Sequence, residues 1–143
     1  EEVIGKYVIL KQAMDLCTSP ILQLATYEYL RRGLLLEHIK KIIASYREKR
    51  DLMLKTLAEY MPKEVSWTRP EGGLFLWLTL PKHVNATELL PKAIENKVAY
   101  VAGVDFYPDA NVFNDMRLNF SYPTKEQMVE GLKRLAQTIK ECL

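Results

Sequence analysis

One arginine stands in a strand-like segment, where a charge is costly to bury. Met116 to Ser121 alternate between apolar and polar side chains, the pattern of a strand with one buried face. Arg117 falls on the polar face, together with Asn119 and Ser121. A guanidinium held by strand geometry offers a planar pair of donors that matches a carboxylate. Arg117 is therefore a candidate ligand-binding residue, and the sequence leaves a structural salt bridge or a solvent-facing arginine open as alternatives.

Two glycine turns are the other candidate features. The segment 69–73, with the sequence RPEGG, precedes the apolar run LFLW, and Gly72 and Gly73 permit positive φ and close approach of the backbone. Gly103 follows a short apolar segment and is followed by Phe106. Taken alone, each segment predicts only a tight turn.

Other reactive constellations are missing from the sequence. Its two cysteines, Cys17 and Cys142, and its two histidines, His38 and His83, do not have the spacing of a zinc site. There is no phosphate-binding glycine loop and no nucleophile elbow. We expect no metal, and we expect the cysteines to be buried or partly buried thiols in a reducing cytoplasm.

Length, composition and charge narrow the class of protein. The 143 residues are 48% hydrophobic and 27% charged, which suits one folded domain of ordinary size. The net charge of +2 gives no reason to expect a nucleic-acid partner or a membrane surface. No stretch has the length of a membrane-spanning segment or reads as a signal peptide.

Hydrophobic periodicity predicts the elements that must position these residues. Helices are expected over 2–16, 21–32, 35–61, 85–97 and from 125 onward, and strands over 65–68, 73–80, 98–101 and 116–121. Asn85 and Thr124 are expected helix caps, whereas Pro91 predicts a kink or a later start of its helix. The order predicts an α/β fold of two layers, in which helices cover a small mixed or antiparallel sheet after two to three leading helices.

Taken together and in this order, the segments resemble the small domain of fold-type-I pyridoxal-phosphate (PLP) aminotransferases. The resemblance rests on RPEGGLFLW at 69–77, on Gly103 with Phe106, on MRLNFS at 116–121, and on a last helix with Glu130-Gly131 and RLA at 134–136. It is strongest to the class I/II branch with 2-aminoadipate, kynurenine and aromatic aminotransferases. One departure is Ala102, where the family usually has proline before the glycine turn.

The resemblance implies a function for the whole protein and roles for some residues. It implies transfer of an amino group between an amino acid and a 2-oxo acid with PLP as cofactor, in a homodimer. Arg117 occupies the position that grips the substrate α-carboxylate. Gly72, Gly73 and Gly103 are expected at a face that closes on a large domain, and Phe75, Trp77 and Phe106 are expected to shape the substrate site or the core.

The resemblance also implies what this chain lacks. The family's cofactor lysine belongs to a Ser-Lys segment of the large domain, and no equivalent occurs here. We therefore expect residues 1–33 to lead from a missing large domain, 34–143 to form the C-terminal small domain, and the chain alone to bind no PLP covalently and to be inactive. Two alternatives remain: an effector-sensing aminotransferase-like domain of a transcription regulator, and a stand-alone binding module.

Overall fold

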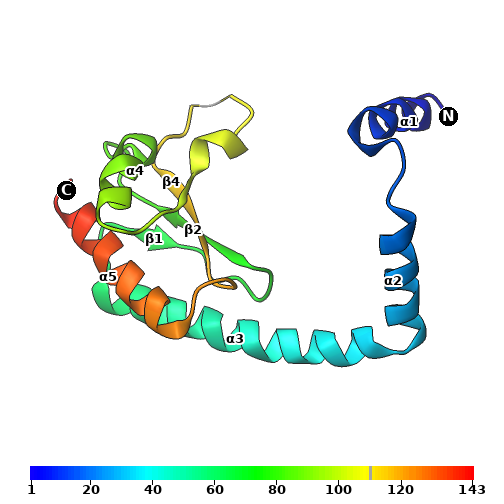
Figure 1. Ribbon diagram of the computed structural model, residues 1–143. Coiled ribbons are helices and arrows are strands. Elements are labelled where there is room, and N and C mark those ends of the chain that lie inside the picture. The colour runs from blue at the N-terminus through cyan, green and yellow to red at the C-terminus, as the bar shows by residue number, and fades with distance from the viewer. Residues whose placement is uncertain (110) are drawn as a thin grey trace. The chain divides into compact units, whose positions relative to one another are not determined.

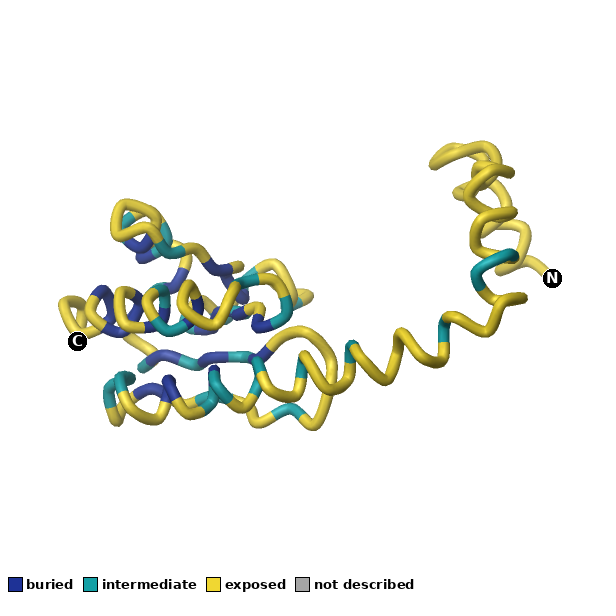
Figure 2. The backbone as a smooth tube through the Cα atoms, turned by 60° about the horizontal axis from the view of Figure 1, so that its bottom comes forward, coloured by how far each residue is buried: buried dark blue, intermediate teal, exposed yellow. Residues whose placement is uncertain are grey.

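The computed structural model describes residues 1–109 and 111–143, which divide into two compact units, Glu1–Ile42 and Ile43–Leu143. The first unit holds α1 (Glu2–Asp15), α2 (Pro20–Arg31) and the beginning of α3 (Leu34–Tyr60) (Figure 1). None of its residues is buried, and its stretch of the tube in Figure 2 carries no dark blue. Both ends of α2 lie within one residue of the bounds predicted from the sequence. Pro20 is its first residue, and Gly33, with a left-handed φ of 70°, comes just after its last turn.

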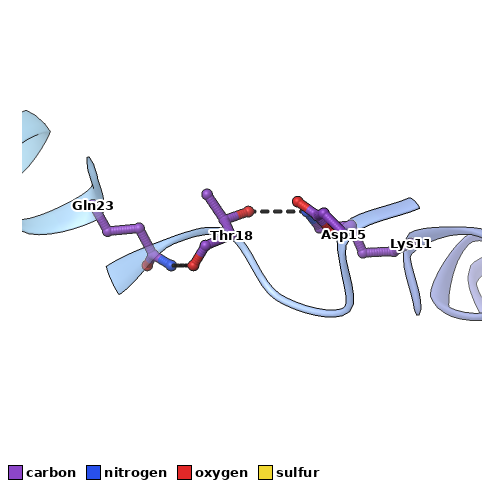
Figure 3. A network of polar contacts seen from close by, with 4 residues as sticks. All are labelled: Lys11, Asp15, Thr18 and Gln23. Carbon is purple, nitrogen blue, oxygen red and sulfur yellow. Dashed lines mark hydrogen bonds and ion pairs between the residues drawn. The ribbon is translucent and has the colours of Figure 1, made fainter. Parts of the chain in front are cut away.

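Polar contacts at the turn between α1 and α2 are all local (Figure 3). Lys11 Nζ donates to Asp15 Oδ2 at 2.6 Å and to Thr18 Oγ1 at 2.9 Å. Gln23 Nε2 donates to the Thr18 carbonyl oxygen at 2.7 Å.

The two cysteines are exposed and free. Cys17 lies in the turn between α1 and α2, and Cys142 lies in the turn after the last helix. The expectation of buried thiols is therefore wrong, because neither residue lies on a packed face of a helix.

The second unit is a layer of strands with helices packed on it (Figure 1). In the described residues the sheet consists of β1 (Ser66–Trp67), β2 (Phe75–Thr79), β3 (Val101–Ala102) and β4 (Asp115–Asn119), in the order β1-β2-β4-β3. Every pairing is antiparallel. The helical layer includes the second part of α3, α4 (Ala86–Glu95) and α5 (Lys125–Lys140). The two-layer α/β prediction is confirmed, with an antiparallel rather than mixed sheet.

The core explains which face of the sheet is covered. Alternate residues of the two central strands are buried, among them Leu76, Leu78, Met116 and Leu118. They share one apolar cluster with buried side chains of the helices, which are Met53 and Leu57 of α3, Leu89 and Ala93 of α4, and Met128, Leu132, Leu135 and Ile139 of α5. The intervening side chains of β2 and β4 therefore point to the opposite face of the sheet.

The predicted helix starts are confirmed at two caps. Asn85 Oδ1 accepts a hydrogen bond from the Thr87 amide at 2.9 Å, and Thr124 forms a capping box with Gln127. Pro91 lies inside α4 without delaying its start. It therefore removes one backbone hydrogen bond, and the packed apolar face of the helix compensates for that loss.

The strand predicted over 98–101 begins later, at Val101. The end of α4 causes the delay. Lys97 takes a left-handed φ of 62°, so that its amide and that of Val98 turn back to the carbonyl oxygens of Ile94 at 2.9 Å and Ala93 at 3.0 Å. This pair of bonds is a Schellman ending, which usually has glycine where Lys97 stands. The sequence contains no glycine there to signal it.

Candidate functional site

Arg117 lies in the middle of β4, on the sheet face opposite the core. Its cross-strand partner is Trp77 of β2, and its backbone pairs on the other side with Val101 of β3. The residue is half-buried, whereas its chain neighbours Met116 and Leu118 are buried. The alternation read from the sequence is confirmed for these residues, and strands on both sides hold the backbone that carries the guanidinium.

Two phenylalanine rings contact the guanidinium. Arg117 Cζ lies 4.1 Å from the ring centroid of Phe75 and 4.8 Å from that of Phe106. Phe75 belongs to β2, and Phe106 ends the 3-10 helix η1 (Gly103–Phe106). Such cation–π contacts contribute about 0.5–2 kcal/mol each, depending on how dry they are. They also restrict the long side chain without using any of its N–H donors.

The donors of Arg117 have no partner within the described part of the chain. No carboxylate forms an ion pair with it, and no oxygen accepts a hydrogen bond from it, in residues 1–109 and 111–143. Within those residues, the structure therefore does not support the alternative that Arg117 forms a structural salt bridge. A half-buried, permanently charged fork without a partner is suited to an anionic ligand, above all to a planar carboxylate.

A shallow hollow of about 230 Å³ adjoins the guanidinium. It is lined by Phe75, Ala99, Tyr100, Val101, Arg117 and Asn119. Asn119 is the last residue of β4, and its Oδ1 accepts hydrogen bonds from the Ser121 amide at 2.7 Å and the Ser121 hydroxyl at 2.8 Å. Ser121 therefore lies in a turn after the strand rather than on the strand face expected for it.

Phe106 is held by an aromatic cluster on the same face. Its ring stacks edge-to-face on Trp77 at 5.4 Å, and Tyr107 contacts Trp77 at 6.3 Å. Phe106 and Phe75 keep exposed fractions of 47% and 37%, so both rings are available to a ligand. Trp77 lies on β2 and packs against Phe106. Of the two roles that the sequence allowed for Trp77, shaping the substrate site or packing, the structure supports packing.

The glycines serve two different needs. Gly73 has φ 84°, which favours glycine, and a Cβ at Gly72 or Gly73 would meet no atom within 4 Å. The structure therefore brings neither against another side chain. Gly103 is different, because its Cβ would lie 2.6 Å from Asp115 Cβ. Its close approach is to β4 of the same unit, which corrects the expectation that it faces a closing surface.

Asp115 and Tyr107 are site residues that the sequence reasoning missed. Asp115 opens β4 two positions before Arg117, hence on the same face, and it is only 5% exposed. Tyr107 Oη donates to its Oδ2 at 2.5 Å. Burial raises the pKa of Asp115, but the hydrogen bond from Tyr107 and the nearby side-chain donors of Thr79 and Trp77 outweigh this effect and hold the pKa below its usual value. Extending the strand pattern by one residue would have revealed this carboxylate.

Two further classes of site receive no support from the described residues. Residues 1–109 and 111–143 hold no group of three or more His, Cys, Asp or Glu side chains arranged for a metal ion. Over the same residues, no helix combines the length and apolar character that crossing a membrane requires.

Comparison with known proteins gives a consistent picture. No family model matches the sequence. An aromatic-amino-acid aminotransferase of Thermococcus litoralis is 49% identical over 96% of this chain, and a 2-aminoadipate transaminase of Thermus thermophilus is 37% identical over 99%. The crystal structure of a kynurenine aminotransferase from Pyrococcus horikoshii matches 99% of this chain with a TM-score of 0.89 and 46% identity.

Coverage of the relatives is partial. The chain spans 33% and 36% of those two relatives and 35% of that crystal structure. Helix-turn-helix transcriptional regulators are also similar, but at 25–28% identity, so the regulator alternative is not favoured. The chain is therefore similar, in sequence and in fold, to about one third of the length of these aminotransferases, in agreement with its resemblance to their C-terminal small domain.

Proposed function

We propose that this chain is part of a PLP-dependent aminotransferase, which transfers an amino group between an amino acid and a 2-oxo acid, and that Arg117 binds the substrate α-carboxylate. The observation that carries the role of Arg117 is its guanidinium, half-buried against Phe75 and Phe106 and without a partner in the described residues. Similarity to aminotransferases over 96–99% of the chain supports the activity.

The residues around Arg117 fit a substrate group rather than the cofactor. PLP, when bound, acts as an electron sink for the reacting carbon. The hollow beside Arg117 contains no lysine and no hydroxyl other than that of Tyr100, which is committed to the Ala86 carbonyl oxygen at 2.6 Å. The described residues of this site thus provide neither a covalent anchor nor a phosphate cradle, and we assign the cofactor site to a large domain outside this chain.

The contribution of this chain is to orient the substrate. Two parallel hydrogen bonds from Arg117 would fix the plane of the carboxylate, and hence the direction of the bonds at the α-carbon. Phe75 and Phe106 would cover the bound carboxylate and exclude water, which strengthens the ion pair. Gly72 and Gly73 would be close-approach positions for the large domain, because their open surroundings leave space for another surface.

The proposed partners are a large domain of the same polypeptide and a second subunit of a homodimer. Residues 1–33 would lead from the large domain, and 34–143 would form the small domain. A reducing cytoplasm remains our expectation for the protein, because two cysteines near opposite ends of the sequence are too few for a disulfide scaffold.

Substitution of Arg117 in the complete enzyme tests the assignment. Arg117→Lys keeps the charge and loses the fork, which should lower kcat/KM for amino acids by about one to two orders of magnitude. Arg117→Ala should lower it further, while amines without a carboxylate become relatively better substrates. A value for Arg117→Ala within about threefold of the unsubstituted enzyme would refute the role. The matched control is Arg134→Lys, because Arg134 lies on α5 and pairs with Glu130.

Reduction with borohydride tests where the cofactor is attached. The 143-residue chain is mixed with PLP, reduced and mapped by peptide mass spectrometry. We expect only low, scattered labelling of its lysines. One lysine labelled at near-stoichiometric yield would show that this chain carries its own cofactor site.

A further inference from the structure

A buried carboxylate next to the candidate site lacks a partner that its burial demands. Asp115 is 5% exposed, and its Oδ1 has no hydrogen-bond partner among the described residues. An apolar side chain in the same place would avoid the cost of burying a charge. A buried polar group that is only half satisfied calls for an explanation.

The other oxygen of Asp115 makes a single directed contact. Its Oδ2 accepts from Tyr107 Oη at 2.5 Å, and Tyr107 follows Phe106, the last residue of η1. At the other end of η1, Gly103 lies directly against Asp115. Asp115 therefore holds the short 3-10 segment at both ends.

That segment carries one of the two rings on the arginine. Phe106 reaches Arg117 from η1, whereas Phe75 reaches it from the well-paired strand β2. A strand residue is fixed by its ladder, but a turn of four residues has little hydrogen bonding of its own. The position of Phe106 thus depends on the contacts of η1 with β4 and with Trp77.

We infer that Asp115 and Tyr107 are positioning residues, which fix Phe106 against Arg117 and so keep the guanidinium aligned for a carboxylate ligand. The inference rests on the proposed role of Arg117. It gives the buried side chain of Asp115 a function, because its Oδ2 is the directional acceptor that orients the Tyr107 hydroxyl. Neither residue lines the hollow beside Arg117.

The experiment uses the ¹⁵N-labelled 143-residue chain with acetate as the carboxylate probe, at a concentration where light scattering shows a monomer. The Nε–H resonance of Arg117, assigned by its loss in Arg117→Lys, reports the ring current of Phe106, and its shift on titration gives the acetate Kd. Tyr107→Phe should move this resonance and raise the Kd by about threefold to tenfold, the range expected for one net hydrogen bond. Thr138→Val is the matched control, because it also removes a hydroxyl that donates a hydrogen bond, in this case to the Arg134 carbonyl oxygen on α5.

Substitutions of Asp115 test the same hydrogen bond at its acceptor. Asp115→Asn keeps an acceptor for Tyr107 and should hold the Arg117 resonance near its original position. Asp115→Leu removes the acceptor and buries no charge, so it should fold and should move the resonance as Tyr107→Phe does. The inference then remains testable even if Tyr107→Phe does not fold.

The outcomes separate the two proposals. If neither Tyr107→Phe nor Asp115→Leu moves the Arg117 resonance, or if Thr138→Val moves it equally, the positioning role is wrong. If the resonance moves but acetate never shifts it in the unsubstituted chain, the positioning of Phe106 stands and the carboxylate role of Arg117 fails.

Discussion

Arg117 combines a fixed position with free donors. The strand sets its backbone, and Phe75 and Phe106 restrict its side chain through contacts that leave every N–H open. A lysine would lose this combination, because an ammonium group on a flexible stem has no planar fork. The entropy cost of ordering the side chain is therefore partly met before any ligand arrives.

The carboxyl of Asp115 should make stability depend on pH. Its pKa in the folded chain lies below the ordinary value of 3.8, since hydrogen bonding outweighs the upward effect of burial. A lowered pKa stabilises the fold above the unfolded pKa, and this contribution disappears as the pH falls through the folded pKa. Below about pH 4, the free energy of unfolding of the unsubstituted chain should fall more steeply than that of Asp115→Asn, whose amide does not titrate. Urea denaturation between pH 2 and 7 measures the difference, and a constant gap between the two proteins across that range would contradict it.

At the scale of elements, η1 packs tightly against the neighbouring strand β4 at Gly103. Gly103→Ala would force a methyl group to within 2.6 Å of Asp115 Cβ and 2.9 Å of its carbonyl oxygen. Overpacking of this kind costs about 1–3 kcal/mol, which thermal denaturation of the two chains should detect. Gly72→Ala is the control, since it meets nothing within 4 Å and has no positive φ, and it should leave Tm almost unchanged. Equal Tm values for all three chains would show that η1 can move away freely.

The elements themselves were largely predictable from local patterns. The caps at Asn85 and Thr124 and the alternation around Arg117 are short-range signals, and the structure confirms them. The end of α4 was not predictable, because Lys97 adopts a conformation that sequence rules reserve for glycine or asparagine. The contact of Tyr107 with Asp115 was also hidden, because it depends on how a turn folds back onto a strand.

At the scale of the whole molecule, the two units differ in how well they bury apolar side chains. Residues 43–143 have a shared core, whereas Glu1–Ile42 buries nothing in the described structure. Many large apolar side chains of its helices are exposed, including Val3, Ile4, Tyr7, Val8, Ile9, Leu10, Met14, Ile21, Leu22 and Leu24. Exposed apolar surface on this scale usually marks an interface.

The isolated chain should therefore self-associate. Light scattering should show a mass that rises with concentration, and an apolar-surface dye should bind. A shortened chain of residues 43–143 is the matched control, which should remain closer to a monomer and bind less dye because it retains the core. A clean monomer without dye binding for the full 143 residues would contradict the idea that its first helices need a partner.

The left-handed backbone conformation of Lys97 indicates that the stability of this fold is not at its maximum. A non-glycine residue in that conformation costs about 1 kcal/mol, and glycine would avoid the cost. Lys97→Gly should thus raise the free energy of unfolding by up to about 1 kcal/mol, less the extra freedom of glycine in the unfolded chain. Selection removes variants that fall below a stability threshold and is indifferent to surplus above it. A costly residue that persists at the end of α4 indicates a domain that meets its threshold without this improvement and retains capacity for stabilisation by design.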